Sequence, residues 1–150
     1  MSVRRLEREQ LLDRPLPEVF EFFARAGNLE RITPPWLSFG VVTPEPISMA
    51  PGTMIEYRLR LHGVPLRWLT RIDEWERDRR FVDRQVRGPY RLWRHQHEFE
   101  SVPGGTRVRD RVDYELPLGP LGDVARIAFV DGDLRRIFDY RVQAVAQLLG

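Results

Sequence analysis

The chain has 150 residues, 42% of them hydrophobic and 31% charged, with no cysteine and a formal net charge of +2 at pH 7. This composition predicts a globular protein with a single domain over residues 1–150, and the lack of cysteine excludes disulfides, thiolate metal sites and a cysteine nucleophile. All 24 basic residues are arginines, which barely titrate, so the sequence pI of about 9.5 is weak evidence for nucleic-acid binding.

The N-terminal residues lack the apolar segment of a signal peptide. No run of apolar residues reaches the ~18 that a membrane-spanning helix needs. We therefore expect a cytoplasmic protein with no membrane span.

The first third of the chain predicts a strand followed by two short helices. Leucines among charged residues suggest a strand over Val3–Asp13. After the prolines at positions 15 and 17, the aromatic cluster around Phe20 predicts a helix that runs through Ala26 and stops at Gly27-Asn28. A second helix, Leu29–Ile32, ends before a tandem of prolines.

The hydrophobic period then changes to two, which predicts an antiparallel meander with one wet face. His62-Gly63 is typical of a hairpin turn. We expect strands at Phe39–Thr43, Met54–Leu61, Leu66–Asp73, Phe81–Val86, Arg91–Val102 and Arg107–Leu116.

From Leu121 onward a period of 3.6 returns and predicts a long terminal helix. The arginines at 126, 135, 136 and 141 need not enter its apolar stripe. Gly132 is expected to weaken or kink this helix, at a cost of about 1 kcal/mol relative to alanine. The order of elements predicts an α+β fold: a curved antiparallel sheet of about seven strands wrapped around the terminal helix, with two short helices after the first strand. The apolar stripe comprises Val124, Ile127, Ala128, Leu134, Ile137, Phe138, Val145, Leu148 and Leu149.

The strand Arg91–Val102 carries two histidines on its inward face. Strand parity places His95 and His97 with Trp93 and Phe99, whereas the alternate residues, Gln96 among them, are expected to be solvated.

The following strand turns an aspartate to the same side. Its apolar face holds Val108, Asp110, Val112 and Tyr114. If Gly104-Gly105 is a two-residue turn, Phe99 opposes Asp110 and His97 opposes Val112. Asp110 would then be a diagonal neighbour of His97, at about 7–8 Å.

The inward surface thus collects polar groups that a filled core rarely holds: Asp83, Gln85, His95, His97 and Asp110. A cavity with a few convergent polar groups fits this set. The histidines could serve as acid and base, ligate a metal, or be satisfied structurally by Asp or Tyr. We expect no metal, because no third ligand at a motif spacing is evident, and no cofactor.

On the outward face, arginines alternate with acidic residues on neighbouring strands, which predicts surface ion pairs. Nucleic-acid binding requires a stripe of one sign, so we expect none. The arginines are those at 58, 60, 67, 71, 107, 109 and 111, and the acidic residues are those at 56, 73, 98, 100, 113 and 115.

Several stretches resemble the START-like, or SRPBCC, superfamily, whose helix-grip fold is shared by the birch-pollen allergen family and polyketide cyclases. Within it the chain is similar to uncharacterised bacterial ligand-binding SRPBCC domain proteins. The resemblance implies a deep cavity between sheet and terminal helix that holds a hydrophobic small molecule, in a family of both enzymes and non-catalytic carriers. The stretches that carry it are residues 28–37, 83–90, 93–99, 104–110, 116–119 and 136–141.

Three functions remain open. The first is a binding module for an aromatic, polyketide-like or lipid-like ligand, with an entrance near Trp36-Leu37 and the apolar loop Pro117–Gly122. The second is an aromatase/cyclase or dehydratase that uses a cavity histidine as general base, with His95, His97 and Asp110 as candidates. The third is a protein-interaction domain that uses the outer sheet. The sequence leaves the oligomeric state open. The expected ligand-binding residues are Leu59, Leu61, Trp68, Gln85, Trp93, His95, His97, Phe99, Asp110, Val112, Tyr114 and Phe138, with Ile137 beside the last.

Overall fold

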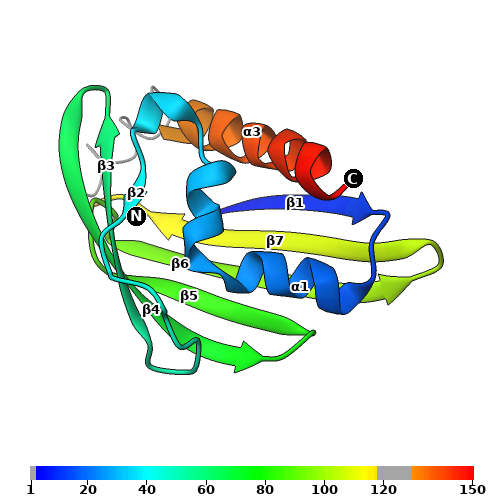
Figure 1. The fold of residues 1–150 in the computed structure, drawn as a ribbon. Helices are drawn as coiled ribbons and strands as arrows, with labels where there is room; N and C mark the ends of the chain where they lie inside the picture. Colours follow the sequence, from blue (N-terminus) through cyan, green and yellow to red (C-terminus); the bar gives the residue numbers. More distant parts are fainter. Residues whose placement is uncertain (1–2, 118–129) are drawn as a thin grey trace.

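A computed structural model describes residues 3–117 and 130–150 of the chain. Figure 1 shows a curved sheet with helices α1 and α3 on its concave side. The helices and strands are β1 (Arg4–Leu12), α1 (Leu16–Ala24), η1 (Ala26–Arg31), η2 (Pro35–Leu37), β2 (Gly40–Val41), β3 (Met54–Leu61), β4 (Val64–Glu76), β5 (Arg80–Arg87), β6 (Leu92–Val102), β7 (Gly105–Glu115) and α3 (Asp131–Leu149).

The seven strands form one antiparallel sheet in the order β1-β7-β6-β5-β4-β3-β2. The expected α+β architecture is therefore confirmed. The His62-Gly63 turn is also confirmed, because both residues have positive φ and Leu61 pairs with Val64 across it.

Two register shifts interrupt the pairing of β4 with β5, and β4 is longer than the predicted Leu66–Asp73. They lie between Leu69 and Thr70 and between Ile72 and Glu74. The second shift restores Trp75 to the inner face, where its ring packs against Phe20. Bulges of this kind bend the strand and help the sheet to curve around the helices.

The predicted register of β6 and β7 is wrong by two residues. The two-residue turn is Pro103-Gly104, so His97 lies opposite Asp110 and Phe99 lies opposite Val108. Gly105 belongs to β7, and a Cβ there would lie 2.0 Å from the carbonyl oxygen of Leu12 on β1. Glycine is required at this position because the backbone of β1 approaches β7 closely, and not because of the turn.

The helix boundaries also differ from the predictions. Helix α1 starts at Leu16 and ends at Ala24, and the second helical segment, η1, starts three residues before the predicted Leu29. Gly132 lies in the first turn of the described α3. The predicted helical residues 121–129 lie outside the described residues, so the kink expected at Gly132 stays a prediction.

Among the described residues, three apolar clusters form the core and meet around the concave face of the sheet. One packs α1 against β6 through contacts of Phe20 and Phe23 with Phe99. The second joins Trp93 of β6 to Phe138 of α3, and the third lies under β3 and β4. The space between these clusters holds the site described below.

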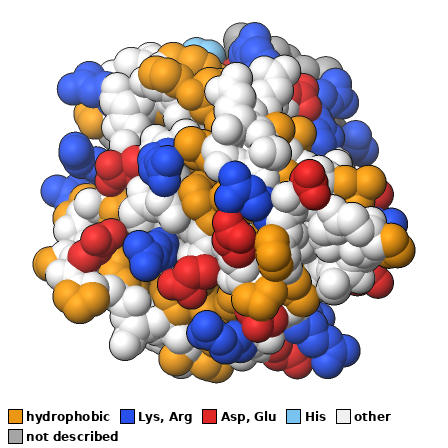
Figure 2. Space-filling view, turned by 45° about the vertical axis from the view of Figure 1, so that its right-hand side comes forward, with side chains coloured by type: hydrophobic (Ala, Val, Ile, Leu, Met, Phe, Trp, Pro, Cys, Tyr) orange, Lys and Arg blue, Asp and Glu red, His pale blue; other side chains and the backbone are white. Residues whose placement is uncertain are grey.

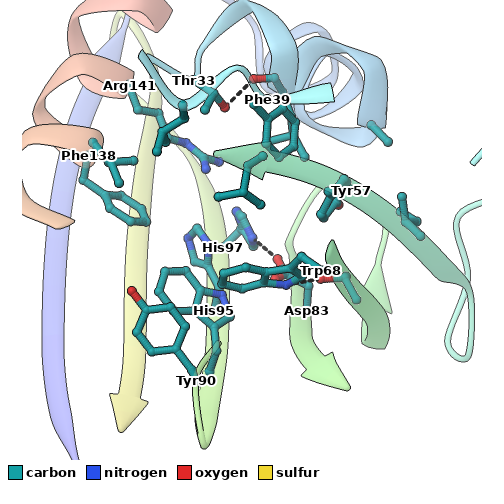
Figure 3. A pocket seen from close by; sticks show the side chains of 18 of the residues that line it. Thr33, Phe39, Tyr57, Trp68, Asp83, Tyr90, His95, His97, Phe138 and Arg141 are labelled. Carbon is teal, nitrogen blue, oxygen red and sulfur yellow. Dashed lines mark hydrogen bonds and ion pairs between the residues drawn. The ribbon is translucent and has the colours of Figure 1, made fainter. Parts of the chain in front are cut away.

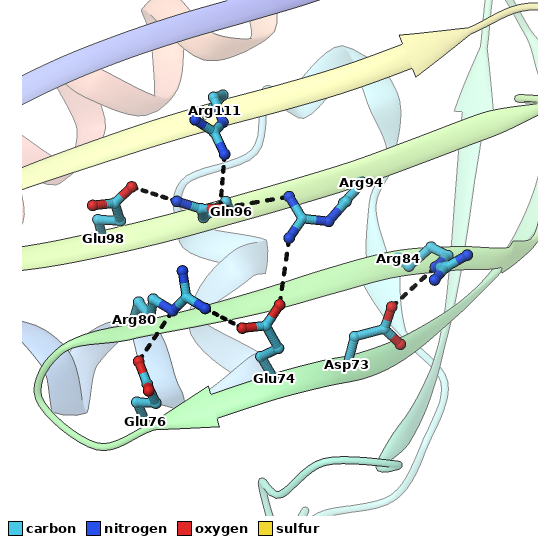
Figure 4. Close-up of polar contacts among 9 residues, drawn as sticks. All are labelled: Asp73, Glu74, Glu76, Arg80, Arg84, Arg94, Gln96, Glu98 and Arg111. Atoms are coloured by element: carbon cyan, nitrogen blue, oxygen red, sulfur yellow. Dashed lines mark hydrogen bonds and ion pairs between the residues drawn. The ribbon is translucent and has the colours of Figure 1, made fainter.

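The outer face carries ion pairs between predicted residues, such as Arg71 with Asp73 at 2.8 Å and Arg107 with Glu100 at 2.7 Å, and further pairs that were not predicted. Arg84 pairs with Asp73 at 2.9 Å, and Arg80 and Arg94 both reach Glu74 (Figure 4). Positive and negative side chains are interspersed on the face shown in Figure 2.

The prediction that Gln96 is solvated is wrong, since its exposed fraction is 5%. Its side-chain oxygen accepts a hydrogen bond from Arg111 at 3.0 Å, and its amide nitrogen donates to Glu98 (Figure 4). Long arginine side chains cover it, because their methylene stems lie along the sheet surface.

Candidate functional site

A cavity of about 180 Å³ lies between the concave face of the sheet and helix α3. Its wall is mainly apolar and aromatic, with the polar groups of β5, β6 and α3 gathered in one region (Figure 3). Its lining includes Leu37 of η2, Ile55, Leu59 and Leu61 of β3, Leu66 and Trp68 of β4, Trp93, His95 and His97 of β6, and Leu134, Ile137, Phe138 and Arg141 of α3.

Two tryptophans and a tyrosine form one wall of this cavity. The rings of Trp68 and Trp93 meet edge to face with centroids 5.0 Å apart, and Tyr90 contacts both. The indole of Trp68 donates a hydrogen bond to Thr70 at 3.0 Å, which satisfies its polar atom. The wall thus offers aromatic surface to a ligand while the indole N–H of Trp68 keeps a hydrogen-bond partner.

The two histidines lie in a stack of rings on the floor of the cavity. His97 stacks on Phe81 with centroids 4.0 Å apart, and His95 stacks on His97 at 3.6 Å. Phe138 packs edge to face against His95 at the end of the stack, with ring centroids 5.4 Å apart. Parity along β5 and β6 produces this arrangement, because Phe81 pairs directly with His97.

Each histidine has its own carboxylate. Nε2 of His97 lies 2.6 Å from Oδ2 of Asp83, and Nε2 of His95 lies 2.8 Å from Oδ1 of Asp110. Nδ1 of His97 lies 3.4 Å from the same Asp110 oxygen, which is an ion-pair distance without hydrogen-bond geometry. All four groups are buried or nearly so.

The surroundings separate the pKa values of the two imidazoles. Burial, reinforced by the neighbouring His97, lowers the pKa of His95 to about 4. Burial also acts to lower the pKa of His97, but the carboxylates of Asp110 and Asp83 outweigh it and raise that pKa above its ordinary value. At neutral pH His95 is therefore uncharged, whereas the imidazolium form of His97 is stabilised relative to that of a free histidine.

Both carboxylates stay ionised. Burial alone would raise the pKa of Asp110, yet the charge of Arg141 and the bond from His95 hold it well below its usual value. The hydrogen bond from His97 likewise lowers the pKa of Asp83 against the effect of burial.

The ionised Asp110 fixes the tautomer of His95. A carboxylate only accepts hydrogen bonds, so Nε2 of the neutral imidazole must carry the proton. Nδ1 of His95 then keeps its lone pair and acts as an acceptor in a residue that lines the cavity.

Arg141 is a site residue that the sequence prediction missed. It lines the cavity from α3, with its guanidinium carbon 5.6 Å from the ring of Phe23 and 5.8 Å from that of Phe138. Its Nε and Nη2 atoms are buried and have no hydrogen-bond partner in the described part of the chain. The spacing contained the signal, because residues 134, 138, 141 and 145 share one helical face.

The structure divides the predicted ligand-binding residues into two groups. Those that line the cavity are Leu59, Leu61, Trp68, Trp93, His95, His97 and Phe138, together with Ile137. Those that lie behind it or beside it are Gln85, Phe99, Asp110, Val112 and Tyr114.

The second group has supporting roles. Gln85 binds both backbone groups of Tyr90 and so shapes the loop between β5 and β6. Phe99 packs into the α1 cluster. Val112 and Tyr114 are packed into the cluster around Trp93.

Of the expected entrance residues, Leu37 is 3% exposed and lines the cavity, whereas Trp36 is 49% exposed. The predicted loop Pro117–Gly122 lies outside the described residues from 118 onward.

Asp83, His95 and His97 also offer three ligand atoms within 4.8 Å of one another, a set that suits a divalent ion. However, Asp83 and His97 already bond to each other at 2.6 Å. A metal would have to replace that hydrogen bond and displace the proton from His97, which the two carboxylates hold in place.

None of the described helices combines the length and hydropathy needed to cross a membrane.

The family model for "Polyketide cyclase / dehydrase and lipid transport" matches residues 12–139 of this chain. A comparison with curated protein sequences found no significant match.

Several solved structures share the fold. The ZhuI aromatase/cyclase from Streptomyces sp. R1128 superimposes with a TM-score of 0.74 at 18% identity, over 97% of this chain and 93% of its own. Ara h 8.0201 superimposes with a TM-score of 0.70 at 17% identity, over 98% of this chain and 97% of its own. TTHA0849 from Thermus thermophilus superimposes with a TM-score of 0.67 at 21% identity, over 96% of this chain and 95% of its own.

Proposed function

Because the chain belongs to the polyketide cyclase/dehydrase and lipid transport family of the SRPBCC superfamily, we propose that it binds an apolar small molecule in the cavity between its sheet and helix α3. The observation that carries this proposal is the cavity wall, which is aromatic and aliphatic apart from a few polar groups. Small-molecule sites in proteins have this composition.

The volume limits the size of the ligand. An engineered apolar cavity of about 150 Å³ is enough to hold benzene. The cavity of about 180 Å³ therefore fits one aromatic ring with a short substituent.

A titration with (E)-prop-1-enylbenzene tests the proposal. The tryptophans 68 and 93 line the cavity, so their fluorescence reports binding, and calorimetry supplies the stoichiometry. Ala26 is 6% exposed and lines the cavity, so Ala26→Leu should fill part of it.

We expect one-to-one binding to the wild type and binding at least about tenfold weaker in Ala26→Leu. The matched control, Ala50→Leu, places the same side chain at an exposed position and should bind normally. Equal binding by both variants would place the ligand outside this cavity.

Enzymatic turnover of the cyclase or dehydratase kind is the second candidate. It is favoured by the Asp110–His95 pair, which leaves Nδ1 of a cavity-lining imidazole unprotonated. His95 rather than His97 is then the general base, because His97 has a carboxylate near each nitrogen.

The low pKa of His95, about 4, argues against this chemistry, since a base so weak removes a carbon-bound proton slowly at neutral pH. Incubation with a short poly-β-keto thioester decides the question. Turnover that disappears in a folded His95→Gln variant would establish the enzyme, whereas binding without turnover favours the carrier.

A further inference from the structure

Arg141 places a positive charge in a wall that is mainly apolar. Its side chain runs from helix α3 toward the two histidines (Figure 3). The guanidinium lies near the rings of Phe23 and Phe138, which supply apolar contacts but no hydrogen-bond acceptors.

The two unpaired atoms of Arg141 lie on one edge of its guanidinium. Nε–H and Nη2–H point in the same direction, and this edge binds the two oxygens of a carboxylate side by side. Both atoms are buried and lack a partner in the described residues. Leaving donors of a charged group unsatisfied is costly, so the site favours an acceptor that comes from outside the chain.

The nearby carboxylates do not occupy this edge. The charge of Arg141 lowers the pKa of Asp110 and Asp83 from a distance, but neither lies within the 4.0 Å of an ion pair with it in the described structure. Asp83 and Asp110 instead flank His97.

We propose that the ligand is a small monocarboxylate, with its carboxylate on the Nε/Nη2 edge of Arg141 and its apolar body, about one aromatic ring in size, against Trp68 and Trp93. This inference rests on the proposed function and adds the chemical class of the ligand. Paired charge-assisted hydrogen bonds in a water-poor cavity are expected to dominate selectivity among ligands of the same shape.

The test compares three probes with one shape. These are trans-cinnamate, its neutral amide, and (E)-prop-1-enylbenzene, in which a methyl group replaces the carboxylate. Each is titrated calorimetrically at pH 7 into the wild type, Arg141→Met and Arg135→Met. Arg135 is an exposed arginine of the same helix that does not line the cavity, so it is the matched control.

We expect the wild type and Arg135→Met to bind cinnamate about 10- to 100-fold more tightly than the amide. Arg141→Met should lose this preference while its affinity for propenylbenzene changes little. The comparison of acid with amide on the wild type alone stands even if the Arg141 variant fails to fold.

Equal affinities for acid and amide on the wild type would overturn the proposal and indicate a neutral carbonyl ligand. A preference for the acid that survives in Arg141→Met would place the carboxylate elsewhere and overturn it too. Binding of propenylbenzene without binding of cinnamate would refute the carboxylate and leave the proposed function standing. Failure of all three probes would refute both.

Discussion

Acidification is expected to destabilise the fold through His95. The ordinary histidine pKa of 6.5 applies to the unfolded chain, whereas burial lowers the pKa of His95 to about 4 in the folded protein. Between these values the unfolded chain binds the extra proton, so stability falls as the pH decreases from 6.5 toward 4. At about 1.36 kcal/mol per pKa unit, the loss amounts to about 3 kcal/mol.

This pH window separates most of the effect of His95 from the effects of its neighbours. The pKa values of Asp83 and Asp110 are lowered, so their contributions begin to fall near pH 5 and are lost mainly below the ordinary aspartate value of 3.8. The pKa of His97 is raised, so its contribution is complete below pH 6.5 and is lost only as the pH rises further.

Urea unfolding, followed by tryptophan fluorescence at pH 7, 6, 5 and 4, measures the effect. The His95→Gln variant keeps a side-chain N–H for Asp110 but cannot titrate. Its free energy of unfolding should therefore fall over this range by about 3 kcal/mol less than that of the wild type. Parallel pH profiles of the variant and the wild type would show that the folded protein protonates His95 readily and would refute the reasoning.

Three further outcomes are expected. Asp83→Asn removes one of the two carboxylates that raise the pKa of His97, so an NMR titration should give that imidazole a lower pKa than in the wild type; an unchanged value would contradict the ion pair. Gly105→Ala should cost about 2–3 kcal/mol in urea unfolding, because its Cβ meets the backbone of Leu12, and more than Gly104→Ala, whose Cβ meets open space. Treatment with EDTA should leave the melting temperature unchanged; a decrease would indicate a bound metal, for which the Asp83, His95 and His97 group is the candidate site.

Most of the fold follows from periodicity in the sequence. Alternation along β6 places His95 and His97 on the buried face, and the hairpin at His62-Gly63 forms as predicted. These features depend on local parity and turn chemistry, which neighbouring residues determine almost alone.

The partners of the two histidines could not be predicted, because they depend on register. Two adjacent glycines allow two turn positions with the same parity, and the choice between them changes the residue opposite Asp110 by two positions along β6, from Phe99 to His97. In the structure the side chain of Asp110 is hydrogen-bonded to His95, and the side chain of His97 is hydrogen-bonded to Asp83 of a different strand. Parity arguments identify the face of a side chain, but not its neighbour across the sheet.

Arg141 illustrates a different gap. Its charge argues for solvent, while its spacing from Phe138 and Val145 argues for the buried face of α3. The cavity resolves this conflict, since a guanidinium can occupy the apolar face where open volume lies beside it. A local pattern does not reveal that volume, because it arises from the curvature of the whole sheet.

The proposal that the cavity binds an apolar monocarboxylate is tested by native mass spectrometry of the purified protein, followed by extraction under denaturing conditions. We predict one retained molecule of low mass per chain, an apolar monocarboxylate, which is released on unfolding and is absent from Ala26→Leu. A retained molecule that persists unchanged in Ala26→Leu, or one too large for a cavity of about 180 Å³, would contradict it.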